Sequence, residues 1–103
     1  MSYIKPKDAQ ATRVQKVIYD GGPCGVSVAE VKWSNGICIG IRWNETDNQR
    51  RRKTPNSKGM PISSGKPVWF ILPNDIFDAG SDLRKTLSKA KNALDSIHEV
   101  KND

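Results

Sequence analysis

The chain lacks any long apolar run. No segment approaches the roughly 18 consecutive apolar residues of a membrane-spanning helix, and the opening MSYIKPKDAQ lacks the apolar stretch of a secretory signal. We therefore expect a soluble, cytoplasmic protein. Apolar residues fill only 36% of the 103 positions, so three Trp, two Phe and two Tyr must supply much of a modest core. A chain of this length is expected to form a single domain, residues 1–103.

Side chains that carry catalysis or bind metals are also scarce. The sequence has one His and two Cys, and neither Cys24 nor Cys38 belongs to a C-x-x-C pair. This argues against a zinc site and predicts reduced thiols. Segment 59–67, GMPISSGKP, departs from a phosphate-binding loop, because Met60 replaces a required glycine and Pro67 replaces the metal-binding Ser or Thr. The sequence therefore predicts a non-enzymatic protein with no catalytic residue, no metal site and no cofactor.

Negative charge is sparse where positive charge gathers. The net charge is +6, and the excess lies in residues 1–19 and 44–66, which sum to +3 and +4 from four cations against one anion and six against two. Clustered Arg and Lys are typical of phosphate binding, since each neutralised phosphate releases counterions. The sequence predicts nucleic-acid contact, DNA or RNA, through Arg50, Arg51, Arg52, Lys53, Lys58, Lys66, Lys5 and Lys7, with Trp43 for base stacking. Trp69 and Tyr19 are further stacking candidates, although core packing is open for all three aromatics. A solvated charge run, or contact with an acidic protein surface, would also account for the cluster.

The segment from Val26 to Trp43 is typical of a β-hairpin. Ser-Asn-Gly at 34–36 favours a three-residue loop, which places apolar residues of both strands on one face. The opposed pairs are then Trp33 with Ile37, Val31 with Ile39, and Ala29 with Ile41. A two-residue Asn-Gly loop would set Lys and Glu against isoleucines, so we reject it. A bulge near Ala29-Glu30 is expected, because the apolar residues upstream of it alternate out of phase with those downstream.

Two further strands are predicted around the hairpin, at Thr12–Tyr19 and Pro67–Pro73. The second of these is apolar on both faces, which requires cover on both sides or a partner on one. Residues 1–11 are predicted to be a flexible arm, and 44–66 a long basic loop. The expected fold class is α+β, with a strongly curved antiparallel sheet of about four strands spanning 12–73 and a C-terminal amphipathic helix at 81–100.

The helix predicted at 81–100 begins after Ser81, a favourable N-cap. Its apolar residues are spaced four and three apart and form a narrow stripe of Leu83, Leu87, Ala90, Leu94 and Ile97. This stripe would either pack on the sheet and close it, or pair with a second helix in a homodimer. The residues predicted for such a partner interface are Leu83, Leu87, Leu94 and Ile97.

Two resemblances bear on function. Arg42-Trp43-Asn44 followed by 59–73, GMPISSGKPVWFILP, resembles a pattern in small uncharacterised bacterial and mobile-element proteins. The strand lengths and expected bulge resemble SH3-like small barrels, which bind nucleic acids and peptides, although this chain ends in a long helix where that pattern has a fifth strand. The first pattern carries no assigned chemistry, whereas the likeness to SH3-like barrels implies a binding module without choosing its ligand. The leading hypothesis is a nucleic-acid-binding module, and the alternative is a mobile-element factor that binds a host protein complex through the Val68–Leu72 strand or the helix stripe.

Overall fold

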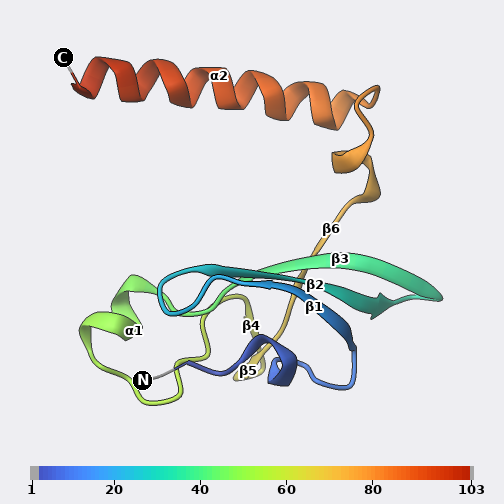
Figure 1. The fold of residues 1–103 in the computed structure, drawn as a ribbon, viewed down its shortest axis with the longest axis vertical. Helices are drawn as coiled ribbons and strands as arrows, with labels where there is room; N and C mark the ends of the chain where they lie inside the picture. Colours follow the sequence, from blue (N-terminus) through green and yellow to red (C-terminus); the bar gives the residue numbers. More distant parts are fainter. Residues whose placement is uncertain (1–2, 103) are drawn as a thin grey trace. The chain divides into compact units, whose positions relative to one another are not determined.

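The computed structural model describes residues 3–102 of the chain, which divides into two compact units, one ending at Leu72 and the other beginning at Pro73. The secondary structure of the first unit follows the chain from a 3-10 turn through six strands and one short helix, which Figure 1 labels. The elements are η1 (Pro6–Asp8), β1 (Val14–Asp20), β2 (Val26–Trp33), β3 (Gly36–Trp43), α1 (Asp47–Arg51), β4 (Ile62–Ser63), β5 (Lys66–Pro67) and β6 (Phe70–Leu72). The second unit contains η2 (Asn74–Phe77) and α2 (Asp82–Asn102).

The main sheet is antiparallel and has four strands in the order β1-β2-β3-β6 (Figure 1). The α+β class, the four-stranded antiparallel sheet and the C-terminal helix are therefore confirmed. The sheet is open, with β1 and β6 at its edges, and it is not strongly curled. Only Phe70–Leu72 of the predicted 67–73 strand joins it, because Lys66–Pro67 pair with β4 in a separate hairpin.

The predicted hairpin register is wrong by one residue. Trp33 pairs with Gly36 and Val31 with Cys38, so the loop is Ser34-Asn35, with Ser34 in the left-handed region at φ 55°. A one-residue shift exchanges the two faces of a strand. Consequently, Ile37, Ile39 and Ile41 lie on the face opposite to Ala29 and Val31. The expected bulge near Ala29-Glu30 is also misplaced: β2 pairs continuously with β3, and the irregularities lie in β1, between Val14 and Lys16 and between Val17 and Tyr19.

The core lies on one face of the sheet and is built around Trp69. This indole is 4% exposed and donates from Nε1 to the carbonyl oxygen of Ala9 at 2.8 Å. It packs over Gly40, where a Cβ would lie 3.1 Å from Trp69 Cβ and 2.9 Å from Val31 Cγ2. Glycine is thus required on β3 for the indole to reach the sheet. Ala29 and Val31 complete this small core.

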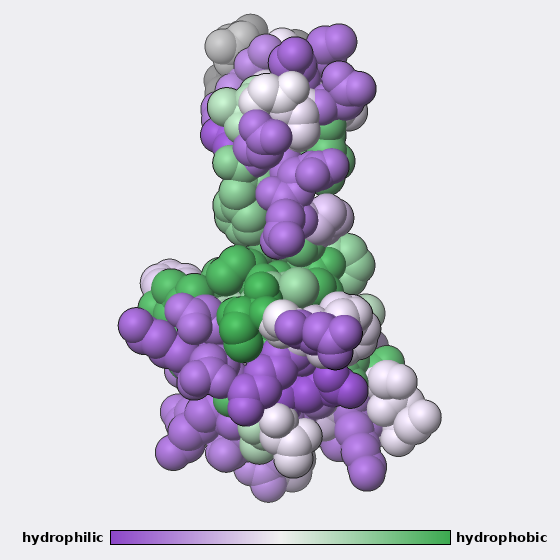
Figure 2. Space-filling view, turned by 90° about the vertical axis from the view of Figure 1, so that its right-hand side faces the viewer, coloured by the Kyte–Doolittle hydropathy of each residue, from purple (hydrophilic) through white to green (hydrophobic). Residues whose placement is uncertain are grey.

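The opposite face of the sheet, called here the open face, is apolar as well. Figure 2 shows hydrophobic side chains gathered along the sheet, above a mainly hydrophilic remainder of the first unit. Their exposure follows from the register, which directs alternate residues of four strands away from the core. The apolar residues of the open face are Tyr19, Val26, Val28, Ile37, Ile39, Ile41, Trp43, Phe70 and Leu72, and the same register places Lys16, Glu30 and Lys32 on this face toward the hairpin end.

Residues 3–11, expected to form a flexible arm, contact the rest of the first unit. Tyr3 forms a bridge with Ser57, and its hydroxyl lies 3.1 Å from both carboxylate oxygens of Asp20. Pro6 in η1 and Ala9 after it are buried, Ala9 completely. The hydrogen bond from Trp69 Nε1 to the Ala9 carbonyl oxygen therefore joins the N-terminal segment to the core.

The second unit consists of η2 and the long helix α2. Ser81 caps α2 as expected: its Oγ accepts from the Arg84 backbone N–H at 3.1 Å and donates to the Asp75 carbonyl at 2.6 Å. The helix begins at Asp82, close to the expected boundary. No helix within the described part of the chain has the length and apolar character to cross a membrane.

Candidate functional site

The predicted basic loop contains a short helix, α1, whose N-terminus is closed by a capping box. Thr46 Oγ1 accepts from the Gln49 backbone N–H at 3.2 Å, and Gln49 Oε1 accepts from the Thr46 N–H at 3.0 Å. The same Gln49 oxygen accepts from the Gly59 N–H at 3.0 Å, which ties α1 to the returning chain. A Cβ at Gly59 would lie 1.9 Å from the Trp43 carbonyl oxygen, so only glycine allows this approach.

Buried polar groups hold the start of this loop against the sheet and tie its middle to that start. Ser57 is completely buried, and its Oγ lies 3.0 Å from Glu45 Oε2. Asn44, also buried, donates to Asp20 Oδ1 at 3.1 Å and to the Gly22 carbonyl at 2.9 Å, while its Oδ1 accepts from Ser27 Oγ at 2.7 Å. Because these groups are mostly satisfied, they fix the loop in place at little desolvation cost.

Arg42 is a second anchor for the same loop. This side chain is 2% exposed and extends from β3 on the core side, with its guanidinium carbon 5.9 Å from the centroid of the Trp69 ring. It donates to the carbonyl oxygens of Lys58 and Val68, and to that of Pro61 at 3.4 Å. Burial lowers the pKa of Arg42 from its usual value to about 10, so it remains protonated at neutral pH. Sequence reasoning missed this buried arginine, which acts as structural support and does not face solvent.

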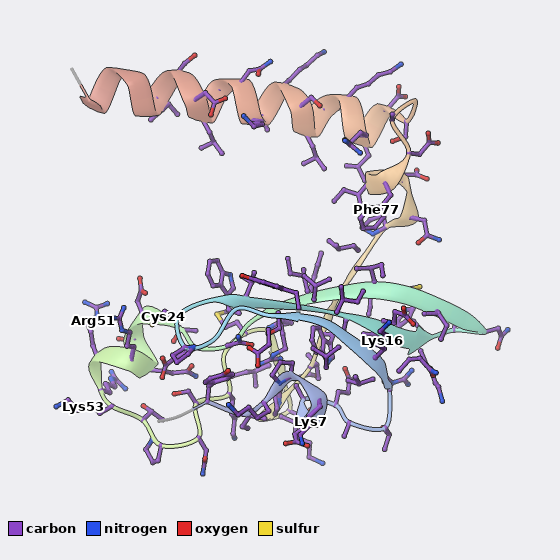
Figure 3. The ribbon with its side chains drawn as sticks, viewed as in Figure 1. Lys7, Lys16, Cys24, Arg51, Lys53 and Phe77 are labelled. Carbon is purple, nitrogen blue, oxygen red and sulfur yellow. The ribbon has the colours of Figure 1, made fainter. Side chains whose placement is uncertain are left out.

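The four consecutive cations Arg50, Arg51, Arg52 and Lys53 are exposed at and just after the C-terminal turn of α1. Figure 3 shows Arg51 and Lys53 pointing outward from the helix. Among the side chains that the structure describes, none of the four forms an ion pair, and the pair that occurs is Lys91 with Asp95 at 2.8 Å on α2. Their charges are therefore available to a ligand.

The remaining predicted cations do not all join this cluster. Lys58 and Lys66 are exposed near the turn between β4 and β5, where Lys58 Nζ donates to the Gly65 carbonyl at 2.6 Å. Lys5 and Lys7 flank or belong to η1, which packs with the core side of the sheet, and Figure 3 shows Lys7 at the η1 end of the fold. The structure thus separates the arm lysines from the open face that carries Trp43.

Of the three stacking candidates, Trp43 and Tyr19 lie on the open face, while Trp69 belongs to the core. Trp43 is 54% exposed, and sequence reasoning missed its neighbours Phe70 and Met60, which are 56% and 52% exposed. These three residues line a pocket of about 350 Å³ together with Val26, Ile41, Arg42 and Pro61. The sequence signal for this group is the hairpin register. The correct register places Ile41 and Trp43 on the open face, where Phe70 pairs with Ile41 and Met60 with Trp43.

The predicted partner-interface residues lie on α2 in the second unit. Leu87, Leu94 and Ile97 are exposed, and Leu83 is half-buried near η2. The two cysteines are both free, as expected, with Cys24 exposed and Cys38 half-buried.

Comparison with known proteins yields no family model, no curated sequence and no solved structure that matches this chain.

Proposed function

We propose that this protein is a small non-enzymatic nucleic-acid-binding module that contacts phosphates through Arg50–Lys53. The observation that carries the proposal is the exposure of four adjacent cations, without carboxylate partners among the described residues, on a loop fixed to the sheet by buried polar groups. Guanidinium groups match phosphate oxygens through paired hydrogen bonds. A fixed loop also loses less conformational entropy on binding than a mobile one.

In this proposal, Trp43 stacks on a base of the nucleic acid without selecting a particular base. Its half-exposed ring lies at the end of β3, one residue before the buried Asn44 that leads toward α1. An exposed aromatic beside a cationic cluster is a common arrangement for nucleic-acid binding, because every base has a face that can stack. Lys58 and Lys66 extend the positive charge along the same loop.

The test is a fluorescence-anisotropy titration of a labelled oligonucleotide at several salt concentrations. If the four cations each engage one phosphate, log affinity against log salt should have a slope of about −3.6 on duplex DNA and about −2.8 on a single strand. An affinity that does not change between about 50 and 200 mM salt, or no binding at the lower concentration, would contradict the proposal.

A second candidate function is protein interaction, in the manner of a mobile-element factor that binds a host complex or pairs with its own copy. It is favoured by the exposed stripe of α2, in which Leu87, Leu94 and Ile97 are 39%, 54% and 50% exposed. Such a stripe is the seam that paired helices use.

If α2 pairs between two copies, Leu87→Arg should convert a dimer into a folded monomer, because a charge would enter the apolar seam. Size-exclusion chromatography with light scattering measures the mass, and circular dichroism measures the helix content. Ser88→Arg is the matched control, since it adds the same charge next to the stripe. A wild-type monomer would exclude self-pairing and leave a different protein as the partner for this candidate.

A further inference from the structure

The pocket beside Trp43 lies where β3 stops pairing with β6 and begins to pair with the loop that contains Met60. Ile41 pairs with Phe70 of β6, whereas Trp43 forms its bridge with Met60 of the returning loop. The pocket of about 350 Å³ opens on the sheet where these two partners part, between the aromatic rings of Trp43 and Phe70. Its volume is at the lower end of the range for small-ligand sites, about 300 to 1,000 Å³. A flat ring is the shape that two exposed aromatics favour.

Met60 connects this apolar pocket to the basic helix. It also borders a hollow of about 350 Å³ lined by Gln49, Arg52 and Thr54, among others. A third hollow, of about 230 Å³, leads from Trp43 and Met60 to Glu45 and Asp47. A phosphate is repelled by carboxylates and attracted by guanidinium groups. A polyanion that enters the pocket is therefore directed past Arg52, away from the acidic side.

Building on the proposed function, we propose that the ligand is a single-stranded nucleic acid, with one unpaired base held in the pocket between Trp43 and Phe70 and the adjoining phosphates on Arg50–Lys53. A base within a duplex is stacked on both sides and cannot enter a pocket in a sheet, whereas a single strand can turn a base outward. The cationic neighbour favours this occupant over an apolar protein side chain. Charge complementarity and ring shape thus select the same ligand.

The experiment compares oligothymidylate, the same oligonucleotide with abasic sites, and a duplex of equal length, each labelled for anisotropy. The duplex and the abasic strand are expected to bind wild-type protein about 5- to 150-fold more weakly than oligothymidylate, the range for one stacked base. Trp43→Leu and Phe70→Leu should weaken oligothymidylate binding by a similar factor. Neither should affect binding of the abasic strand.

Trp33→Leu is the matched control, because Trp33 is 41% exposed beside Arg13 and lies at the opposite end of the β2–β3 pair from Val26 and Trp43. Its affinity should equal that of wild type. The abasic comparison requires no variant, so it decides the question even if a leucine variant does not fold. Equal binding of duplex and single strand, or an unchanged affinity in folded Trp43→Leu, would overturn the inference while leaving salt-dependent binding intact. Loss of all binding would instead overturn the proposed function.

Discussion

Replacing Arg50, Arg51 and Arg52 together with alanine is expected to abolish most of the affinity for single-stranded nucleic acid. Each phosphate contact contributes about 0.7 to the salt slope on a single strand, so the slope should fall from about −2.8 to about −0.7. At about 0.1 M salt this corresponds to an affinity loss of about 100-fold. Anisotropy titration across a range of salt concentrations measures both quantities.

The same substitution should leave the fold intact. The three side chains are exposed and form no ion pair within the described part of the chain, and surface changes of this kind stay within about 0.5 kcal/mol of wild-type stability. Thermal unfolding followed by circular dichroism verifies this point. Binding loss with an unchanged melting temperature assigns the effect to the ligand contact and excludes unfolding.

The matched control removes the same charge elsewhere. Lys7, Lys16 and Lys32 are exposed in the same unit as α1, and Figure 3 shows Lys7 and Lys16 away from that helix. Their joint replacement with alanine also lowers the net charge from +6 to +3. If α1 is the binding surface, this variant should retain nearly all the affinity, because a screened field acts over only about 10 Å at 0.1 M salt. Equal losses in the two triple variants would show that net charge alone drives binding.

The elements of the sheet could be predicted from sequence, but the hairpin register could not. The apolar residues at the hairpin end of β2 and those of β3 lie on opposite faces of the sheet. Val31 of β2 is in the core, for example, whereas Ile39 of β3 is on the open face. A pattern argument assumes one buried face and therefore aligns them side by side. The deciding fact is tertiary: Trp69 needs the space above Gly40, and this fixes which residues of β3 point inward.

The candidate site shows a similar division. Exposure of Arg50–Lys53 was predictable, because clustered cations are rarely buried without partners. Helix α1 could also have been found, since Thr46 and Gln49 have the spacing of a capping box. In contrast, nothing local marks Ala9 as a residue beneath an indole, or Arg42 as a buried support, because each depends on residues distant in sequence.

Arg42→Met is expected to lower the free energy of unfolding by about 2 to 4 kcal/mol, because it leaves buried carbonyl groups of the loop without a donor. Methionine retains much of the volume and removes the buried charge, which offsets part of the cost. The lost hydrogen bonds lower the free energy of unfolding, whereas removal of the buried charge raises it. With three carbonyls bonded and only Nε unpartnered among the side-chain atoms described, we expect the lost hydrogen bonds to dominate. Urea unfolding monitored by tryptophan fluorescence measures the difference.

Arg13→Met is the matched control for this prediction. Arg13 is an exposed arginine that also lies over an indole, 5.0 Å from the Trp33 ring centroid, and donates to one carbonyl, that of Lys32, at 3.2 Å. Its replacement should cost no more than about 0.5 kcal/mol. Arg42→Lys retains the charge but lacks the planar guanidinium group that donates to several carbonyls at once. The stability of this variant should therefore lie between those of wild type and Arg42→Met. If Arg42→Met is as stable as wild type, the buried guanidinium does not support the basic loop, and the fixed placement of Arg50–Lys53 must then come from the other anchors, Asn44, Glu45, Gln49 and Ser57.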